Sequence, residues 1–294
     1  MSSGGERSSP PPPRRCRREA VNYHREGAGA CAVVLIHGIG HHWQAWRPVI
    51  DLLAPDHDVI ACDSPGFGRS PPLATGTEPT IWAYAQAFED FFEQLGLTRP
   101  HVAGNSMGGA IALELARRGS AASATALSPA GFWTEAELRY CQASLAVLAR
   151  LPGPIRPAVR ALSRTRAGRA ALFAQTFGWP SRMPASEAVA TLEDAWAAPA
   201  FAPALAAFSA YRFSEPQQLR AVPLTIAWGV RDRLLLYGRQ APRARAMLPW
   251  ARHLTLGAGH VPFFDDPPAV AEVIRASCAA GALRAARVSV SAAG

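Results

Sequence analysis

The sequence predicts an α/β fold in which a mainly parallel central sheet is flanked by helices. Short apolar runs without polar alternation recur along the chain, which is typical of strands buried on both faces. Segments with apolar residues at helical spacing stand between these runs. The alternation breaks once, between residues 131 and 216, and then resumes. We therefore expect one helical insertion in an otherwise regular α/β domain.

The first 130 residues alternate between expected strands and helices. The apolar run over residues 31–36 ends abruptly at His37-Gly38, as a buried strand that enters a tight loop would. Residues 81–95 have helical spacing and are followed by Gly96, a residue that commonly ends helices. The other elements expected here are an edge strand over 21–25, strands over 57–62, 100–104 and 122–128, and helices over 43–53 and 109–118.

Residues 131–216 have no good strand pattern and are rich in alanine, leucine and arginine, with interspersed prolines. We read this segment as several short helices that form a cap. Parallel sheets bind ligands at the carboxyl ends of their strands, so the cap is expected above that edge. The core would consist of residues 20–130 and 217–280, completed by strands over 222–228 and 252–256 and helices over 240–248 and 268–279.

Both ends of the chain are expected to lie outside the folded core. Residues 1–19 are mostly serine, glycine, proline and arginine, and Pro10 to Pro13 are four consecutive prolines, which exclude a helix or a central strand. This composition predicts a disordered tail. Residues 281–294 are mostly small, and we expect them to be frayed.

The sequence Gly104-Asn105-Ser106-Met107-Gly108 matches the pattern G-x-S-x-G and lies between an expected strand and an expected helix. This context is that of a nucleophile elbow, a turn so tight that side chains do not fit at its corners. It would place the Ser106 hydroxyl at the amino terminus of a helix, where the dipole favours a developing negative charge. Ser106 is therefore the candidate nucleophile.

A serine nucleophile needs a base and a carboxylate that orients the base. Among the eight histidines, His260 is the candidate base, because it follows the strand over 252–256 in a glycine-containing loop. Asp232 follows the strand over 222–228 and is the candidate acid. Asp63 is the alternative acid, although its Pro-Gly-Phe-Gly context resembles turn architecture.

A tetrahedral oxyanion needs backbone N–H donors that converge on one point. The N–H of Met107, directly after Ser106, and that of Ile39, in the loop after the strand over 31–36, are the candidates. We expect His37 to brace this loop. His41 and His42 are expected to be solvated, with contact to the substrate pocket as the alternative.

Composition narrows the possible partners. The formal net charge is +8, but the chain contains no lysine and its arginines are scattered, so we expect no nucleic-acid partner. No apolar run reaches the roughly 18–20 residues of a membrane span, and no apolar segment follows the basic residues near the amino terminus, so neither a membrane partner nor a secretory signal is expected.

The five cysteines are widely spaced and form no C-x-x-C pair, which suits a reducing cytoplasm. The oligomeric state is left open.

Taken together, these motifs resemble those of the α/β-hydrolase superfamily, over about residues 21–279 apart from the cap. The matching segments are His37-Gly38, the turn-rich stretch over 63–70, Gly104 to Gly109, Trp228 to Asp232, and Gly259-His260, in family order. The resemblance implies a serine-hydrolase triad of Ser106, Asp232 and His260, a helical cap and no cofactor. Serine at position 106 argues against haloalkane dehalogenases and epoxide hydrolases, which use aspartate there.

The expected activity is hydrolysis of a small to medium, largely apolar carboxylic ester through an acyl-enzyme (EC 3.1.1). Gly-Asn-Ser-Met-Gly-Gly is similar to the carbon–carbon bond hydrolases of meta-cleavage products, which is the first alternative; perhydrolysis, acyl transfer and a non-catalytic receptor are others. The small-molecule substrate pocket is predicted from residues beside the catalytic loops: His37, Asn105, Phe132, Trp133, Val261 and Phe263.

Overall fold

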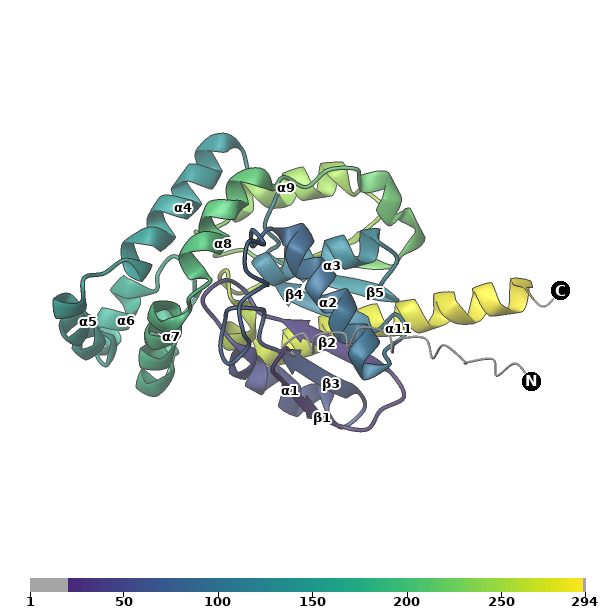
Figure 1. Cartoon of the computed structure of the whole chain (residues 1–294), viewed down its shortest axis with the longest axis horizontal. Coiled ribbons are helices and arrows are strands. Elements are labelled where there is room, and N and C mark those ends of the chain that lie inside the picture. Colours follow the sequence, from purple (N-terminus) through teal and green to yellow (C-terminus); the bar gives the residue numbers. More distant parts are fainter. Residues whose placement is uncertain (1–20, 293–294) are drawn as a thin grey trace, which may run out of the picture.

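The computed structural model describes residues 21–292, and side chains as far as residue 287 (Figure 1). The tail expected over residues 1–19 lies outside the described residues. Seven strands form a single sheet in the order β1-β3-β2-β4-β5-β6-β7. Only β1 runs antiparallel to its neighbour. The strands are β1 (Tyr23–Glu26), β2 (Ala32–Ile36), β3 (Asp58–Cys62), β4 (His101–Asn105), β5 (Ser123–Leu127), β6 (Leu224–Gly229) and β7 (Arg252–Leu256).

Helices cover both faces of the sheet, so its central strands are apolar on both sides. In β2, Val34 and Ile36 join the core beneath α2 and α3, whereas Val33 and Leu35 join the core beneath α1 and α11. The helices of the core are α1 (Arg47–Leu53), α2 (Ile81–Leu95), α3 (Met107–Arg117), α9 (Tyr237–Met247), α10 (Pro262–Asp265) and α11 (Pro267–Ala292). The continuous apolar runs of the sequence therefore correctly indicated strands buried on both faces.

A helical insertion between β5 and β6 forms the cap, which Figure 1 shows on the side of the molecule away from the free end of α11. Its helices are α4 (Glu135–Ala149), α5 (Arg156–Ser163), α6 (Arg166–Leu172), α7 (Ala185–Ala197) and α8 (Phe201–Ala207). Short 3-10 turns are η1 (Trp43–Trp46) in the core, and η2 (Gly153–Ile155), η3 (Pro180–Arg182), η4 (Phe208–Ala210) and η5 (Pro216–Ala221) in the insertion. The predicted α/β fold with a helical cap is confirmed.

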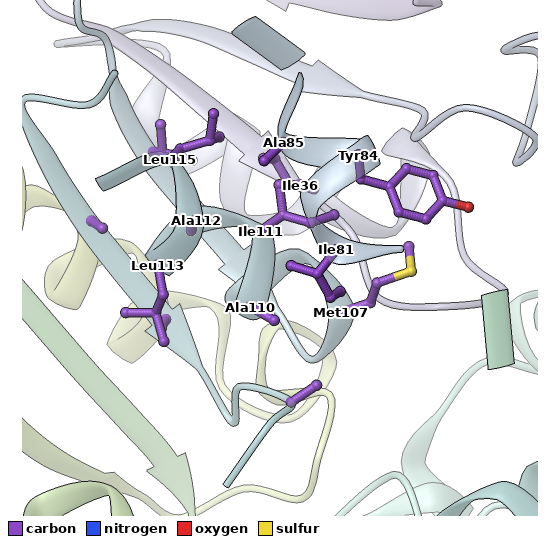
Figure 2. Close-up of a cluster of buried hydrophobic side chains, with 14 of the residues drawn as sticks. Ile36, Ile81, Tyr84, Ala85, Met107, Ala110, Ile111, Ala112, Leu113 and Leu115 are labelled. Atoms are coloured by element: carbon purple, nitrogen blue, oxygen red, sulfur yellow. The ribbon is translucent and has the colours of Figure 1, made fainter. Parts of the chain in front are cut away.

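Helix α3 is buried along its whole first three turns, which gives the residues at its amino terminus a rigid support. Figure 2 shows Met107 and Ile111 of α3 beside Ile81 of α2 and Ile36 of β2, and all four are buried. A close-packed interior of this kind tolerates little movement. The turn before α3 is thus held from below by the core.

The expectation of a frayed segment over residues 281–294 is wrong as far as the structure describes it. Helix α11 continues to Ala292, because alanine-rich sequence favours the helix. Gly281 does not end the helix; a Cβ there would lie 2.7 Å from Cε1 of His101, so the glycine permits close packing. Among the described residues, no helix combines the length and apolar character needed to cross a membrane.

Candidate active site

Ser106 occupies a strained turn between β4 and α3. Its backbone has φ 57° and ψ −114°, a conformation that is uncommon for a residue other than glycine. The neighbouring glycines are required by space: a Cβ on Gly104 would lie 2.1 Å from the Gly108 carbonyl oxygen, and one on Gly108 would lie 2.2 Å from that of Ile36. The turn therefore has the geometry expected of a nucleophile elbow.

Asp232 and His260 form a buried pair at the carboxyl ends of β6 and β7. His260 Nδ1 lies 2.8 Å from Asp232 Oδ2. The same carboxylate accepts the Trp228 indole N–H at 3.1 Å and the backbone N–H groups of Leu234 and Leu235 at 2.9 and 2.8 Å. Four donors thus fix the carboxylate. Because Asp232 accepts the Nδ1 proton, Nε2 remains as the basic nitrogen of the imidazole.

Asn105 connects this pair to the elbow. Its side-chain amide donates to the carbonyl oxygen of His260 at 2.8 Å and to that of Leu127 at 3.1 Å. The residue before Ser106 therefore anchors the backbone of His260. The sequence placed Asn105 in the substrate pocket, but both of its N–H groups are used inside the protein.

The loop after β2 lies against Ser106. A Cβ on Gly38 would be 3.2 Å from the Ser106 Cβ, so only glycine allows the loop to approach this closely. Ile39 follows Gly38, and Met107 begins α3. Within residues 21–292, no hydrogen-bond acceptor is found for the backbone N–H of either residue.

His37 braces this loop, as expected from the sequence, and is not available to a substrate. Its Nδ1–H donates to the Gly38 carbonyl oxygen at 2.7 Å, and its Nε2 accepts the Ser64 N–H at 2.9 Å. Burial lowers the pKa of His37 to about 4, so the ring is neutral near pH 7. Asp63, the alternative acid, accepts N–H groups of Asn22, Trp43 and Arg69, which makes it a structural carboxylate.

The expectation that His41 and His42 are solvated is wrong, because the cap covers this part of the loop. Both residues are partly buried. His42 Nε2 lies 2.5 Å from Oδ2 of Asp194 in α7. The ring of His41 meets that of Phe263 edge-on, with centroids 6.4 Å apart, and burial lowers its pKa to about 3.

The four apolar residues predicted to line the pocket are almost fully buried. Phe132 stacks on Phe213 with centroids 4.7 Å apart, and Phe263 lies 4.4 Å from Trp46, measured between ring centroids. Trp133 donates its indole N–H to the Tyr211 carbonyl oxygen. Val261 is 2% exposed. These side chains pack inside the protein around the site.

Asp265, in α10, was not singled out in the sequence. Its Oδ2 accepts the backbone N–H groups of Gly259 and Gly178, each at 2.8 Å, and its Oδ1 accepts that of Trp179 at 3.0 Å. One carboxylate thus joins the loop that carries His260 to the cap. No local sequence signal marks this role, because the partners come from distant parts of the chain.

A mainly parallel sheet flanked by helices, a helical insertion between β5 and β6, and a serine in a strained turn between β4 and α3 define a protein of the α/β class. The chain belongs to the alpha/beta hydrolase fold family, which it matches over residues 32–267. The class that the fold and the motifs indicated is therefore the correct one.

Two curated relatives match parts of the chain. One is the dihydrolipoyllysine-residue acetyltransferase component of the acetoin cleaving system of Cupriavidus necator, 35% identical over 132 residues; the match covers 44% of this chain and 35% of the relative. Another is a 2-hydroxy-6-oxononadienedioate/2-hydroxy-6-oxononatrienedioate hydrolase of a Pseudomonas species, 37% identical over 101 residues, which covers 33% of this chain and 35% of that protein. The chain thus spans about a third of the length of these two relatives.

A solved structure resembles nearly the whole chain. It is that of a membrane phospholipase A described as a bacterial virulence factor, with a TM-score of 0.69 and 26% sequence identity, and the match covers 89% of this chain and 83% of that chain. Because the match covers 89% of this chain, it includes much of the cap as well as the core.

Proposed function

We propose that this protein is a serine hydrolase that cleaves a small to medium, largely apolar carboxylic ester. The observation that carries the proposal is the combination of the strained Ser106 turn with the buried Asp232–His260 hydrogen bond, joined through Asn105. Nucleophilic attack on an acyl carbon requires an exposed serine on a tight turn and an imidazole that a carboxylate orients.

In the proposed mechanism, Ser106 Oγ attacks the ester carbonyl while His260 Nε2 takes the hydroxyl proton. The backbone N–H groups of Ile39 and Met107 donate to the oxyanion of the tetrahedral intermediate. When the intermediate collapses, His260 gives the proton to the leaving alcohol, and Ser106 remains acylated. His260 then takes a proton from a water molecule that attacks the acyl-enzyme, and returns this proton to Ser106 Oγ as the bond to the acyl carbon breaks and the acid is released. Asp232 holds the tautomer and stabilises the imidazolium.

Four described cysteines, Cys31, Cys62, Cys141 and Cys278, are free thiols. This supports a reducing compartment, and we place the enzyme in the cytoplasm, acting on a small molecule.

Carbon–carbon bond hydrolysis of a meta-cleavage-type diketone is the second candidate. It is favoured by the 37% identity, over 101 residues, to a hydrolase named for 2-hydroxy-6-oxononadienedioate. The same triad would serve, so the substrate distinguishes the two candidates. Perhydrolysis or acyl transfer would replace the final water by a peroxide or an alcohol.

The test compares hydrolysis of short-chain p-nitrophenyl esters with that of a dienoate diketone, together with labelling by a fluorophosphonate probe. We expect ester turnover and labelling of the wild type, and loss of both in Ser106→Ala, with kcat reduced at least about 10⁴-fold. Ser128→Ala is the matched control, because Ser128 is a buried serine directly after the neighbouring strand β5, as Ser106 is directly after β4. Full ester turnover by Ser106→Ala would refute the mechanism. Diketone cleavage that is faster than ester hydrolysis would favour the second candidate. A wild type that the probe does not label would favour a non-catalytic receptor.

A further inference from the structure

A hydrogen bond connects the loop that carries Ile39 to the cap. His42 Nδ1 accepts the backbone N–H of Gln44 at 3.2 Å. Since Nδ1 is the acceptor, Nε2 carries the proton and donates to Asp194 of α7 at 2.5 Å. The imidazole therefore bridges its own loop and the cap, with both nitrogens used.

The cap residues that follow Asp194 touch the same region. Gly40 has φ +80°, and a Cβ there would lie 2.6 Å from the Phe201 ring and 3.5 Å from Ala195 Cβ. Ala200 donates its N–H to the Gly66 carbonyl oxygen at 3.2 Å. The stretch from Asp194 to Phe201 thus rests directly on the loops after β2 and β3.

The candidate oxyanion donor lies between two anchor points of this short loop. On one side, Gly38 lies against Ser106, because a Cβ added to Gly38 would be 3.2 Å from the Ser106 Cβ. On the other side, His42 is held by Asp194. The His41 N–H donates to the Gly38 carbonyl oxygen at 3.2 Å, which closes the turn around Ile39. A displacement of His42 would therefore be transmitted to the Ile39 N–H within three residues.

The charges around His42 favour this contact. Burial alone would lower the pKa of His42, but the hydrogen bond and charge of Asp194, with a smaller contribution from Asp63, raise it above its ordinary value. His37 and His41, from the same loop, also face this region. The pair is partly shielded from water, with side-chain exposures of 18% for His42 and 27% for Asp194.

We propose that Asp194 is a positioning residue: through His42 it holds the loop that carries the Ile39 N–H, so that the oxyanion hole takes its reactive shape only when the cap is seated. This inference rests on the proposed function, because it gives the Ile39 N–H a catalytic task. It links substrate entry beneath the cap to the stabilisation of the transition state. The oxyanion hole would then form at the same time as the cap docks on the loop.

The test uses Asp194→Ala and Asp194→Asn in the full chain, with Glu193→Gln as the control. Glu193 is the adjacent residue of α7 and pairs with Arg160 inside the cap at 2.8 Å, so its change alters the same helix without touching His42. We expect Asp194→Ala to lower kcat for a p-nitrophenyl ester about 10- to 100-fold with little change in KM, less than complete removal of an oxyanion donor would. Asp194→Asn keeps an acceptor and should recover much of the activity.

Two further readouts separate positioning from a general loss of structure. Affinity for phenylboronic acid, which forms a tetrahedral adduct with serine, should fall in parallel with kcat/KM in Asp194→Ala but not in Glu193→Gln. In a double-mutant cycle, His42→Ala combined with Asp194→Ala should cost no more than either change alone, since both break the same contact. Wild-type kcat and boronate affinity in Asp194→Ala, or equal losses in Glu193→Gln, would overturn the proposal.

Hydrogen exchange of the backbone amides over residues 39–42 provides a readout that does not need turnover. Exchange should be faster in Asp194→Ala and unchanged in Glu193→Gln; unchanged exchange in Asp194→Ala would overturn the positioning role. An inactive wild type with this exchange pattern would contradict the proposed function while supporting the contact. An active wild type with an equally active Asp194→Ala would contradict the inference alone.

Discussion

Asn105 donates its side-chain N–H to the carbonyl oxygen of His260 at 2.8 Å, so the residue before Ser106 also fixes the loop of the candidate base. The elbow and the base loop are far apart in the sequence, since Asn105 and His260 are separated by 155 positions, and this hydrogen bond holds them together. Its second N–H, to Leu127 at 3.1 Å, ties the same side chain to the neighbouring strand β5. Asn105 is fully buried, so these bonds are not exchanged with water.

Replacing Asn105 by alanine should impair both stability and catalysis. The His260 carbonyl oxygen would lose its buried donor, which costs about 1–3 kcal/mol in the free energy of unfolding. A shift of His260 relative to Ser106 of about 1 Å would lower kcat roughly 100-fold. Urea unfolding and ester kinetics measure the two effects. Asn105→Asp should be more damaging, since it replaces a donor by a buried acceptor, and wild-type kcat in Asn105→Ala would contradict this assignment.

Replacing Asp232 by asparagine should lower kcat far more than it lowers stability. The amide keeps the shape of the side chain but presents an N–H toward His260 Nδ1 or forces the other tautomer, so Nε2 no longer acts as the base. By analogy with the serine-protease triad we expect a loss of about 10⁴-fold in kcat with a modest change in KM. Asp266→Asn, which alters a carboxylate that accepts the Ala269 N–H at the start of α11, is the control. A similar kcat in both variants would exclude Asp232 as the orienting acid.

Strands such as β2 and β6 could be predicted because they are buried, largely apolar runs with no competing period. The edge strands β1 and β7 are partly exposed and are not continuous apolar runs, so they were recognised from their place in the alternation of strands and helices. The expected strand over 252–256 agrees with β7 at both ends, and the expected helix over 81–95 agrees with α2. Ser106, Asp232 and His260 could be singled out for a related reason. Each lies in the loop that follows a strand, β4, β6 and β7 respectively, and carboxyl ends of parallel strands meet at one edge.

The contacts of the cap could not be predicted. Asp194 and His42, or Asp265 and Gly178, meet only because folded helices dock, and neither pair carries a periodic or local signal. The side chains of His41 and His42 were expected in water for the same reason, since the loop is covered by α7 from far along the chain. The extension of α11 past residue 280 could not be predicted either, because the small residues there give no apolar period, whereas in the fold Gly281 permits close packing on His101.

Stability should fall in mild acid because His37 is buried in its neutral form. Its pKa is lowered by burial to about 4 in the folded state, whereas an unfolded histidine titrates near 6.5. Above about pH 6.5 the ring is neutral in both the folded and the unfolded state, so its titration does not change the free energy of unfolding. As the pH falls from about 6.5 to about 4, only the unfolded chain gains a proton at this position, so the free energy of unfolding falls by up to about 1.4 kcal/mol per pH unit.

Urea unfolding between pH 4 and pH 8 measures this dependence. Burial also lowers the pKa of His41, to about 3. His41 is therefore a second group that only the unfolded chain protonates in this pH range, and it too lowers the free energy of unfolding as the pH falls. His37→Gln removes one titrating group and should reduce the slope by about one proton over this range. An unchanged slope in His37→Gln would show that His37 is not the group responsible.

Replacing Asp265 by alanine should loosen the cap and the base loop together. The backbone N–H groups of Gly259, Gly178 and Trp179 would lose a charged acceptor at once. Hydrogen bonds to charged groups contribute about 1.5–3 kcal/mol each, so we expect a loss of about 3 kcal/mol or more in the free energy of unfolding. Because Gly259 precedes His260, kcat should also fall, while limited proteolysis should become faster within the cap. Glu187→Gln is the control, because it removes an exposed carboxylate from helix α7 of the cap. Equal proteolysis rates in the two variants would contradict the assignment of Asp265 as the link between the cap and the loop that carries His260.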